Sequence, residues 1–198
     1  MFAAVVAVAA AAGGWLARSL LSAEPVLTAA TRLPSPRSLH QFTLLDSSGG
    51  TFDSTALAQK PSLLFFGFTQ CPDVCPTTLA LLAQLRRDPA WPGLRVVMIS
   101  VDPQRDTPQV LRQYLQGFDP QFVGLTGNPD SVEALTRDVG VAVAQVRLPG
   151  GGYSIDHSAT VFVTNAQGQL AAVFTPPLNR AAMLADLRAL WPLLQHRR

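Results

Sequence analysis

The side chains in this sequence that are best suited to chemistry are its two cysteines, Cys71 and Cys75. Two thiols in one loop can bind a soft metal ion, close a disulfide or remain inert in the core. Redox motifs of the C-x-x-C type have two residues between the cysteines, whereas this chain has three, Pro72, Asp73 and Val74. The longer spacing leaves room for an ion between the sulfur atoms. It therefore favours metal binding, although it does not forbid a disulfide.

The cysteines lie where a predicted strand is followed by a predicted helix. Residues 63–68 form a nearly continuous apolar run, which is typical of a strand buried on both faces. Residues 77–85 carry leucines at helical spacing. Open α/β sheets place their chemistry at the carboxyl ends of such strands, and the start of a helix lowers the pKa of a nearby thiol. We therefore expect thiolates, which serve equally as nucleophiles and as metal ligands.

His157 is the third candidate ligand. The chain has three histidines, and we expect His40, before the first predicted hairpin, and His196, in the polar C-terminal tail, to be solvated. His157 enters a predicted strand near the C-terminus that should face the cysteine loop across the end of the sheet. The alternative is a structural histidine that is held by Asp156 or by the backbone.

Two thiolates and one imidazole form a donor set that suits copper. Thiolates favour Cu(I), and an added imidazole also accommodates Cu(II). A structural zinc site would need a fourth protein ligand, for which the sequence offers no candidate. The carboxylates of Asp73 and Asp156 are candidates to tune the basicity of the ligands from outside the coordination shell, with exposed loop acids as the alternative.

The elements that must position these residues follow an α/β order. We predict β-hairpins at 42–52 and 158–174, further strands at 63–68, 95–101, 122–125 and 141–148, a flexible turn at 149–152, and helices over 77–85 and starting at Thr107, Asn128 and Asn179. A central β-α-β-α pattern with a closing hairpin and helix predicts a thioredoxin-like fold with an N-terminal β-hairpin. Thioredoxin-like oxidoreductases carry a cis-proline where this layout places His157. Residues 150–174 contain no proline, which favours metal ligation over general disulfide exchange.

The N-terminal segment differs from the rest of the chain. Residues 1–23 carry no charge apart from Arg18 and consist mostly of Ala, Val and Leu. They predict a transmembrane anchor helix or, alternatively, a cleaved signal peptide, and either would export the domain. Residues 24–38 contain prolines and several Ser and Thr, so we expect a linker there. Residues 39–198 are then the thioredoxin-like domain.

Composition limits the classes of function. The 198 residues are 48% hydrophobic, which is enough for one domain with a sizeable core. A net charge of +2 gives no basic surface for nucleic acid. The basic residues Arg18, Arg32 and Arg37 follow the apolar segment and do not precede it, so charge alone does not set the orientation of an anchor.

Three blocks of the sequence resemble the Sco/SenC family of thioredoxin-fold copper proteins. In family order they are residues 66–76 (FGFTQCPDVCP), 101–108 (VDPQRDTP) and 153–159 (YSIDHSA). The resemblance spans about residues 39–191, and by this match Cys71, Cys75 and His157 correspond to the family's copper ligands. Gln70 stands where many members have histidine, which weakens the case for a further ligand nearby.

The resemblance implies a copper chaperone, not an enzyme, that delivers copper to the copper site of cytochrome c oxidase during assembly. The implied partners are the copper-binding subunit of a haem–copper oxidase and a thioredoxin-like reductant or another copper carrier. The implied location is the bacterial inner membrane, with the globular domain on the periplasmic side. The alternative is a thiol–disulfide reductase that keeps the oxidase cysteines reduced, with Cys71 and Cys75 as its redox pair.

Overall fold

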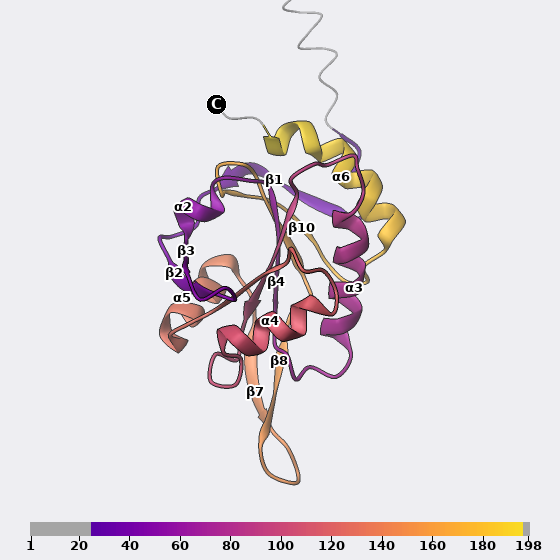
Figure 1. The fold of residues 1–198 in the computed structure, drawn as a ribbon. Coiled ribbons are helices and arrows are strands. Elements are labelled where there is room, and N and C mark those ends of the chain that lie inside the picture. Colours follow the sequence, from indigo (N-terminus) through magenta and orange to yellow (C-terminus); the bar gives the residue numbers. More distant parts are fainter. Residues whose placement is uncertain (1–24, 196–198) are drawn as a thin grey trace, which may run out of the picture.

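The computed structural model describes residues 25–195. The strands are β1 Ala30–Arg37, β2 Thr43–Asp46, β3 Thr51–Asp53, β4 Ser62–Gly67, β5 Arg95–Ser100, β6 Val123–Thr126, β7 Val143–Arg147, β8 Tyr153–His157, β9 Val161–Thr164 and β10 Leu170–Phe174. The helices are α2 Ser54–Leu57, α3 Val74–Arg86, α4 Pro108–Gln116, α5 Pro129–Val139 and α6 Arg180–Gln195. Figure 1 shows how these elements are arranged.

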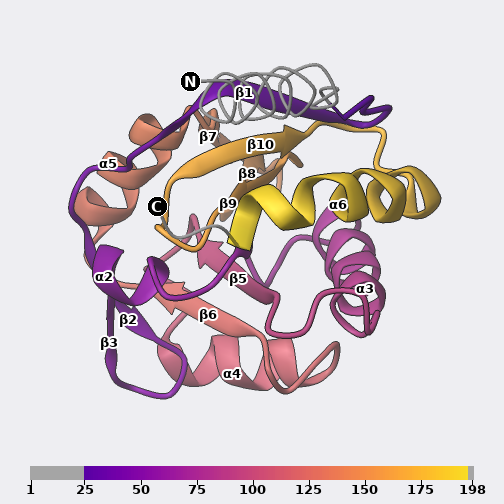
Figure 2. The same ribbon diagram turned by 90° about the horizontal axis from the view of Figure 1, so that it is seen from above.

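A central eight-stranded sheet has the strand order β1-β10-β9-β4-β5-β6-β2-β3. Its middle is parallel, with β4 beside β5 and β5 beside β6, as the crossover helices α3 and α4 require. All six residues of β4 are buried. Figure 2 shows α3 and α6 on one side of the sheet and α5 on the other. The predicted α/β, thioredoxin-like fold and its N-terminal hairpin, β2–β3, are therefore confirmed.

The segment predicted to be a linker is in part a strand. Within residues 24–38, β1 pairs antiparallel with β10, with Ala30 opposite Phe174. The prolines that suggested a linker, Pro34 and Pro36, fall where the register shifts between Arg32 and Arg37. Proline lacks the N–H that a ladder needs but is tolerated at a sheet edge, and β1 is an edge strand.

A buried carboxylate on α6 fixes the chain as it enters β1. Asp186 is 2% exposed, and its side chain accepts the backbone N–H groups of Thr28 at 3.0 Å, Ala29 at 2.7 Å and Ala30 at 2.7 Å. Burial alone would raise the pKa of Asp186, but these hydrogen bonds lower it on balance. The domain therefore extends further towards the N-terminus than its composition suggested.

A two-stranded sheet, β7–β8, stands apart from the central sheet. The strand predicted at 141–148 is confirmed as β7, but its partner β8 was not predicted. Gly151 and Gly152 have φ of +89° and +79°, and these values let them close the turn between the two strands. Figure 1 shows this hairpin extending from the body of the domain. The predicted turn at 149–152 is therefore the tip of a hairpin that carries His157 at its base.

Helices α4 and α5 begin at the side-chain caps that were predicted from the sequence. Thr107 accepts a hydrogen bond from the N–H of Val110, and Asn128 accepts one from the N–H of Asp130. Helix α3 begins at Val74, earlier than the predicted start at residue 77. This difference places Cys75 in the first helical turn.

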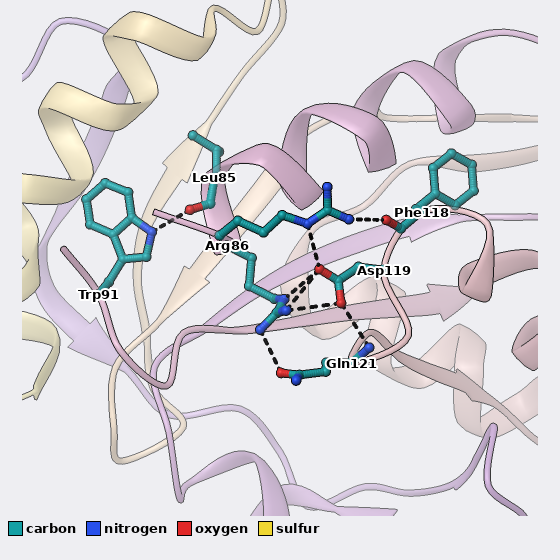
Figure 3. Close-up of polar contacts among 7 residues, drawn as sticks. Leu85, Arg86, Trp91, Phe118, Asp119 and Gln121 are labelled. Carbon is teal, nitrogen blue, oxygen red and sulfur yellow. Dashed lines mark hydrogen bonds and ion pairs between the residues drawn. The ribbon is translucent and has the colours of Figure 1, made fainter. Parts of the chain in front are cut away.

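The C-terminal end of α3 is fixed by a buried ion pair (Figure 3). Arg86 donates to both carboxylate oxygens of Asp119, at 3.1 Å to Oδ1 and 2.9 Å to Oδ2, and to Gln121 Oε1 at 2.8 Å. Just beyond the helix, the indole of Trp91 donates to the carbonyl of Leu85 at 2.6 Å. Burial alone would raise the pKa of Asp119, but hydrogen bonds from Gln121 and Arg86 lower it on balance.

The predicted anchor or signal peptide, residues 1–23, lies outside the described residues. Between residues 25 and 195, no helix combines the length and the apolar character needed to cross a membrane.

Candidate metal centre

The structure brings the three predicted ligands together. One ligand atom each from Cys71, Cys75 and His157 lies within 4.8 Å of the other two. The Sγ atom of Cys75 is 3.2 Å from Nε2 of His157. The cysteines come from the loop after β4 and the start of α3, and the histidine comes from the end of β8. Residues 82 positions apart therefore meet at one edge of the fold.

Cys75 is completely buried, at 0% exposure. Its sulfur packs against the backbone of β4, where a Cβ atom on Gly67 would lie 2.9 Å from Sγ. Glycine at position 67 therefore makes the room that this thiol occupies.

Cys71 lies at the surface edge of the same site, at 9% exposure. Its N–H donates to the carbonyl of Phe68 at 3.3 Å, and its Sγ accepts the N–H of Cys75 at 3.4 Å. Asp73, at the N-cap of α3, makes no side-chain capping hydrogen bond. The sulfur of Cys71 is therefore directed at one of the free amides that a helix presents at its start.

The expectation that the helix start lowers the pKa of the thiols is wrong for Cys75. Burial raises the pKa of this thiol, and its interaction with Cys71 raises it further. Removal from water disfavours the charged thiolate more than the helix start favours it. Without a cation, Cys75 therefore remains a thiol at neutral pH. A metal ion must displace its proton to bind.

His157 presents Nε2 to the cysteines as an acceptor, 3.2 Å from Sγ of Cys75. Its Nδ1 lies 3.1 Å from the carbonyl oxygen of Ser158. Because a carbonyl can only accept, Nδ1 carries the proton and Nε2 keeps its lone pair. Burial lowers the pKa of His157, which favours this neutral form. The rings of Phe65 and Phe68 meet the imidazole edge-on, with centroids 6.0 and 5.8 Å away, and enclose it on the protein side.

The remaining predicted residues lie around the centre. Asp73 and Asp156 are exposed, and their tuning role stays a prediction. Gln70 accepts a hydrogen bond from Arg105. The side chain of His40 is 89% exposed, as predicted, and its Nδ1 lies 2.8 Å from Asp138. His196 lies outside the described residues.

Sequence reasoning missed the residues that brace the cysteine loop. Asp106 is 0% exposed and accepts the N–H of Thr69 at 3.0 Å and its hydroxyl at 2.6 Å. Ser100 donates to the same carboxylate at 2.7 Å. Asp106 lies in the block 101–108 that resembles the Sco/SenC family. The sequence did not indicate that this carboxylate would accept hydrogen bonds from Thr69 and Ser100. This block holds the loop that carries Cys71.

Two sulfur atoms and one neutral imidazole nitrogen form a soft donor set. Among residues 25–195, the side chains of Cys71, Cys75 and His157 are the group of three that lies close enough together to hold one metal ion. Such a set suits Cu(I) through its thiolates and accommodates Cu(II) through its imidazole, whereas a structural zinc site would use a fourth protein ligand. The residues present therefore fit copper.

Comparison with known proteins gives a consistent result. A family model described as SCO1/SenC matches residues 31–192. An SCO2-like protein of Rickettsia conorii is 35% identical over 151 residues, which are 74% of this chain and 74% of that protein. The structure of ScoI from Bradyrhizobium japonicum with copper bound is 34% identical and has a TM-score of 0.69, covering 76% of this chain and 97% of that one.

A second solved structure, apo Sco1 from Thermus thermophilus, is 38% identical and has a TM-score of 0.73, covering 85% of this chain and 99% of that one. The family match begins within β1, in agreement with the place of that strand in the sheet. With most of its length matched, the chain belongs to the SCO1/SenC family.

Proposed function

We propose that this protein is a copper carrier that binds copper through Cys71, Cys75 and His157 and delivers it to the copper-binding subunit of a haem–copper oxidase during assembly. One observation carries the proposal: two thiols and an unprotonated imidazole nitrogen converge within 4.8 Å. The copper-bound ScoI of Bradyrhizobium japonicum supports copper as the cargo. The oxidase recipient rests on the family resemblance.

The geometry assigns each ligand a separate task. Cys71 is the more exposed thiol, so copper is captured and released on its side. Cys75 is buried and gives up its proton when copper binds. The hydrogen bond from Nδ1 to Ser158 holds the ring of His157 with Nε2 facing Cys75. Transfer then proceeds by exchange of these ligands for those of the recipient, and it requires both thiols to be reduced.

The proposed location is the periplasmic side of a bacterial inner membrane, with residues 1–23 as the anchor. The apolar sequence of this segment supports an export signal. A thioredoxin-like reductant or another copper carrier is the proposed second partner, because the thiols must be reduced before copper is loaded. A C-terminal alkaline phosphatase fusion should be active in cells, and an inactive fusion would contradict this orientation.

The test of the cargo is a copper titration of the full chain under reducing conditions, with Cys75→Ser, His157→Ala and the control His40→Ala. We expect one tightly bound Cu(I) in the wild type and the control. Cys75→Ser should lose it, and His157→Ala should mainly weaken Cu(II). Absence of tight copper in the wild type would contradict the proposal.

Thiol–disulfide reduction is a second candidate function, because both cysteines are free thiols that lie close together. Cys71 would attack the partner's disulfide, Cys75 would resolve the mixed disulfide, and both would end as a disulfide while the partner is reduced. His157 separates the two functions. Reductase activity should largely survive His157→Ala, whereas Cu(II) affinity should fall.

A further inference from the structure

His157 is not part of the central sheet, although β9, which begins at Val161 opposite Phe65 of β4, follows it closely in the chain. Its strand, β8, pairs with β7 and with no strand of the eight-stranded sheet. At the base of this hairpin His157 lies opposite Val143. The cysteines follow β4, in the middle of the main sheet, through a short loop. Packing on Phe65 and Phe68 helps to place the imidazole, and contacts between the hairpin and the cysteine loop hold the other end of β8.

Arg105 makes such a contact, from the loop between β5 and α4. Its Nη1 donates to Gln70 Oε1 at 3.0 Å and to the carbonyl of Tyr153 at 3.1 Å. Gln70 is the residue before Cys71, and Tyr153 is the first residue of β8. One nitrogen atom thus joins the cysteine loop to the strand that carries His157.

Arg105 is itself held in place by a buried acid. Its Nε donates to Asp102, which is 3% exposed. The other oxygen of Asp102 accepts the hydroxyl of Tyr153 at 2.8 Å. The guanidinium carbon lies 3.9 Å from the centre of the Tyr153 ring, in cation–π contact. Asp102 and Arg105 therefore contact Tyr153 at its hydroxyl, its ring and its carbonyl.

A guanidinium is needed for this arrangement. Its planar fork can bond Asp102 through one nitrogen and Gln70 and Tyr153 through another, whereas the ammonium of lysine is a point charge. The Nη2 atom of Arg105 is buried and has no hydrogen-bond partner among residues 25–195. An unsatisfied buried donor costs free energy, so the other contacts of the guanidinium must outweigh this cost.

We infer that Arg105 is a positioning residue of the metal centre, which holds His157 within reach of Cys75 by tying β8 to the cysteine loop. This inference rests on the proposed function. Because Cu(I) is retained by the two thiolates and Cu(II) depends on the imidazole, Arg105 acts mainly on Cu(II). Its removal should resemble a partial loss of His157.

The experiment measures Cu(I) and Cu(II) affinities of the full chain in wild type, Arg105→Gln and Arg188→Gln. Arg188 is a matched control because its side chain is 63% exposed and its ion pair with Asp88 is long, at 3.5 Å. For Arg105→Gln we expect Cu(II) affinity to fall about 10-fold, as for other residues that orient metal ligands. The sulfur-to-Cu(II) charge-transfer absorption should change, and Cu(I) affinity should stay unchanged. Arg188→Gln should match the wild type.

A double-mutant cycle with His157→Ala separates positioning from a merely structural role. If Arg105 acts through His157, Arg105→Gln causes no further loss of Cu(II) affinity in the His157→Ala background. Additive losses, or an equal loss of Cu(I) and Cu(II), would overturn the inference. If Arg105→Gln does not fold, Arg105→Lys keeps the charge, removes the bridge and should lower Cu(II) affinity alone.

Failure of the inference is distinguishable from failure of the proposed function. A wild-type protein that binds no copper would remove the proposed function and this inference with it. If the wild type binds copper and neither Arg105→Gln nor Arg105→Lys changes its Cu(II) affinity, only the inference about Arg105 is wrong.

Discussion

At its C-terminal end, helix α3 presents Arg86 to a carboxylate whose two oxygens both accept from it, as Figure 3 shows. At its N-terminal end the same helix presents the thiol of Cys75 to an imidazole nitrogen and a second thiol. In the first region opposite charges neutralise one another. In the second, three atoms able to bind a metal ion lie within 4.8 Å of one another.

Helix α3 is therefore a fixed support at one end and a binding element at the other. The pair of Arg86 and Asp119 is almost removed from water and anchors α3 to the segment before β6. At the other end, the rings of Phe65 and Phe68 pack edge-on against the imidazole of His157, and the ligand atoms are those that would hold copper. Mutations at the two ends should therefore affect different properties, stability at one and copper affinity at the other.

The largest effect is expected for copper affinity in Cys75→Ser. Loss of a direct thiolate ligand should cost more than the 10- to 100-fold, or about 1.4–2.7 kcal/mol, that is typical of residues outside the coordination shell. The measurement is a competition titration with a Cu(I) chelator, with Thr77→Ser in the same helical turn as control. Retention of wild-type Cu(I) affinity by Cys75→Ser would exclude Cys75 as a ligand.

At the other end of α3, Asp119→Asn should lower the free energy of unfolding by about 3 kcal/mol, because it leaves the charge of Arg86 without its partner in a largely buried pair. Copper affinity should not change. Urea unfolding followed by circular dichroism measures the loss. The control is Glu133→Gln, which removes an exposed pair with Arg137 that should contribute less than about 0.5 kcal/mol. Equal effects of the two variants would contradict the account.

The two properties should change together in Gly67→Ala. The added Cβ would lie 2.9 Å from Cys75 Sγ and 2.9 Å from the ring of Phe65, so overpacking should cost about 2 kcal/mol and displace the thiol. Gly150→Ala is the control, because nothing lies within 4 Å of its added Cβ. If thermal unfolding and copper titration of Gly67→Ala both match the wild type, Cys75 does not pack closely against β4.

The smallest expected effect is a pH dependence at the fixed end. Because the pKa of Asp119 is lower in the folded protein than its usual value, its ionised form stabilises the fold above the unfolded pKa of about 3.9. This contribution is lost as the pH falls through the folded pKa. The gap in unfolding free energy between wild type and Asp119→Asn should therefore narrow from pH 7 to pH 3. If this difference in unfolding free energy stays constant with pH, the charge of Asp119 does not stabilise the fold.

Local sequence signals were enough to predict most of the fold. The apolar run of β4 and the caps at Thr107 and Asn128 depend only on neighbouring residues, and they were predicted correctly. Strand β1 was missed because its prolines suggest a linker, while its pairing depends on the distant β10. Strand β8 was missed because the sequence of its five residues is mostly polar, and only its pairing with β7 makes it a strand.

In the candidate site, too, local features could be predicted and long-range ones could not. The residue types of the ligands and their places in the fold were predicted from the sequence. The direction of the pKa shift of Cys75 could not be predicted, since it depends on burial by other parts of the chain. Nor were the contacts of Arg105 predictable, because its partners Gln70 and Tyr153 are 35 and 48 residues away.

The most direct test of the central claim is copper-edge X-ray absorption of the full chain loaded with one equivalent of Cu(I) under reducing conditions, beside His157→Ala. We expect two sulfur scatterers and one imidazole nitrogen in the wild type, and loss of the imidazole contribution in the variant. A wild-type spectrum with fewer than two sulfur scatterers, or one that His157→Ala leaves unchanged, would contradict a centre built from Cys71, Cys75 and His157.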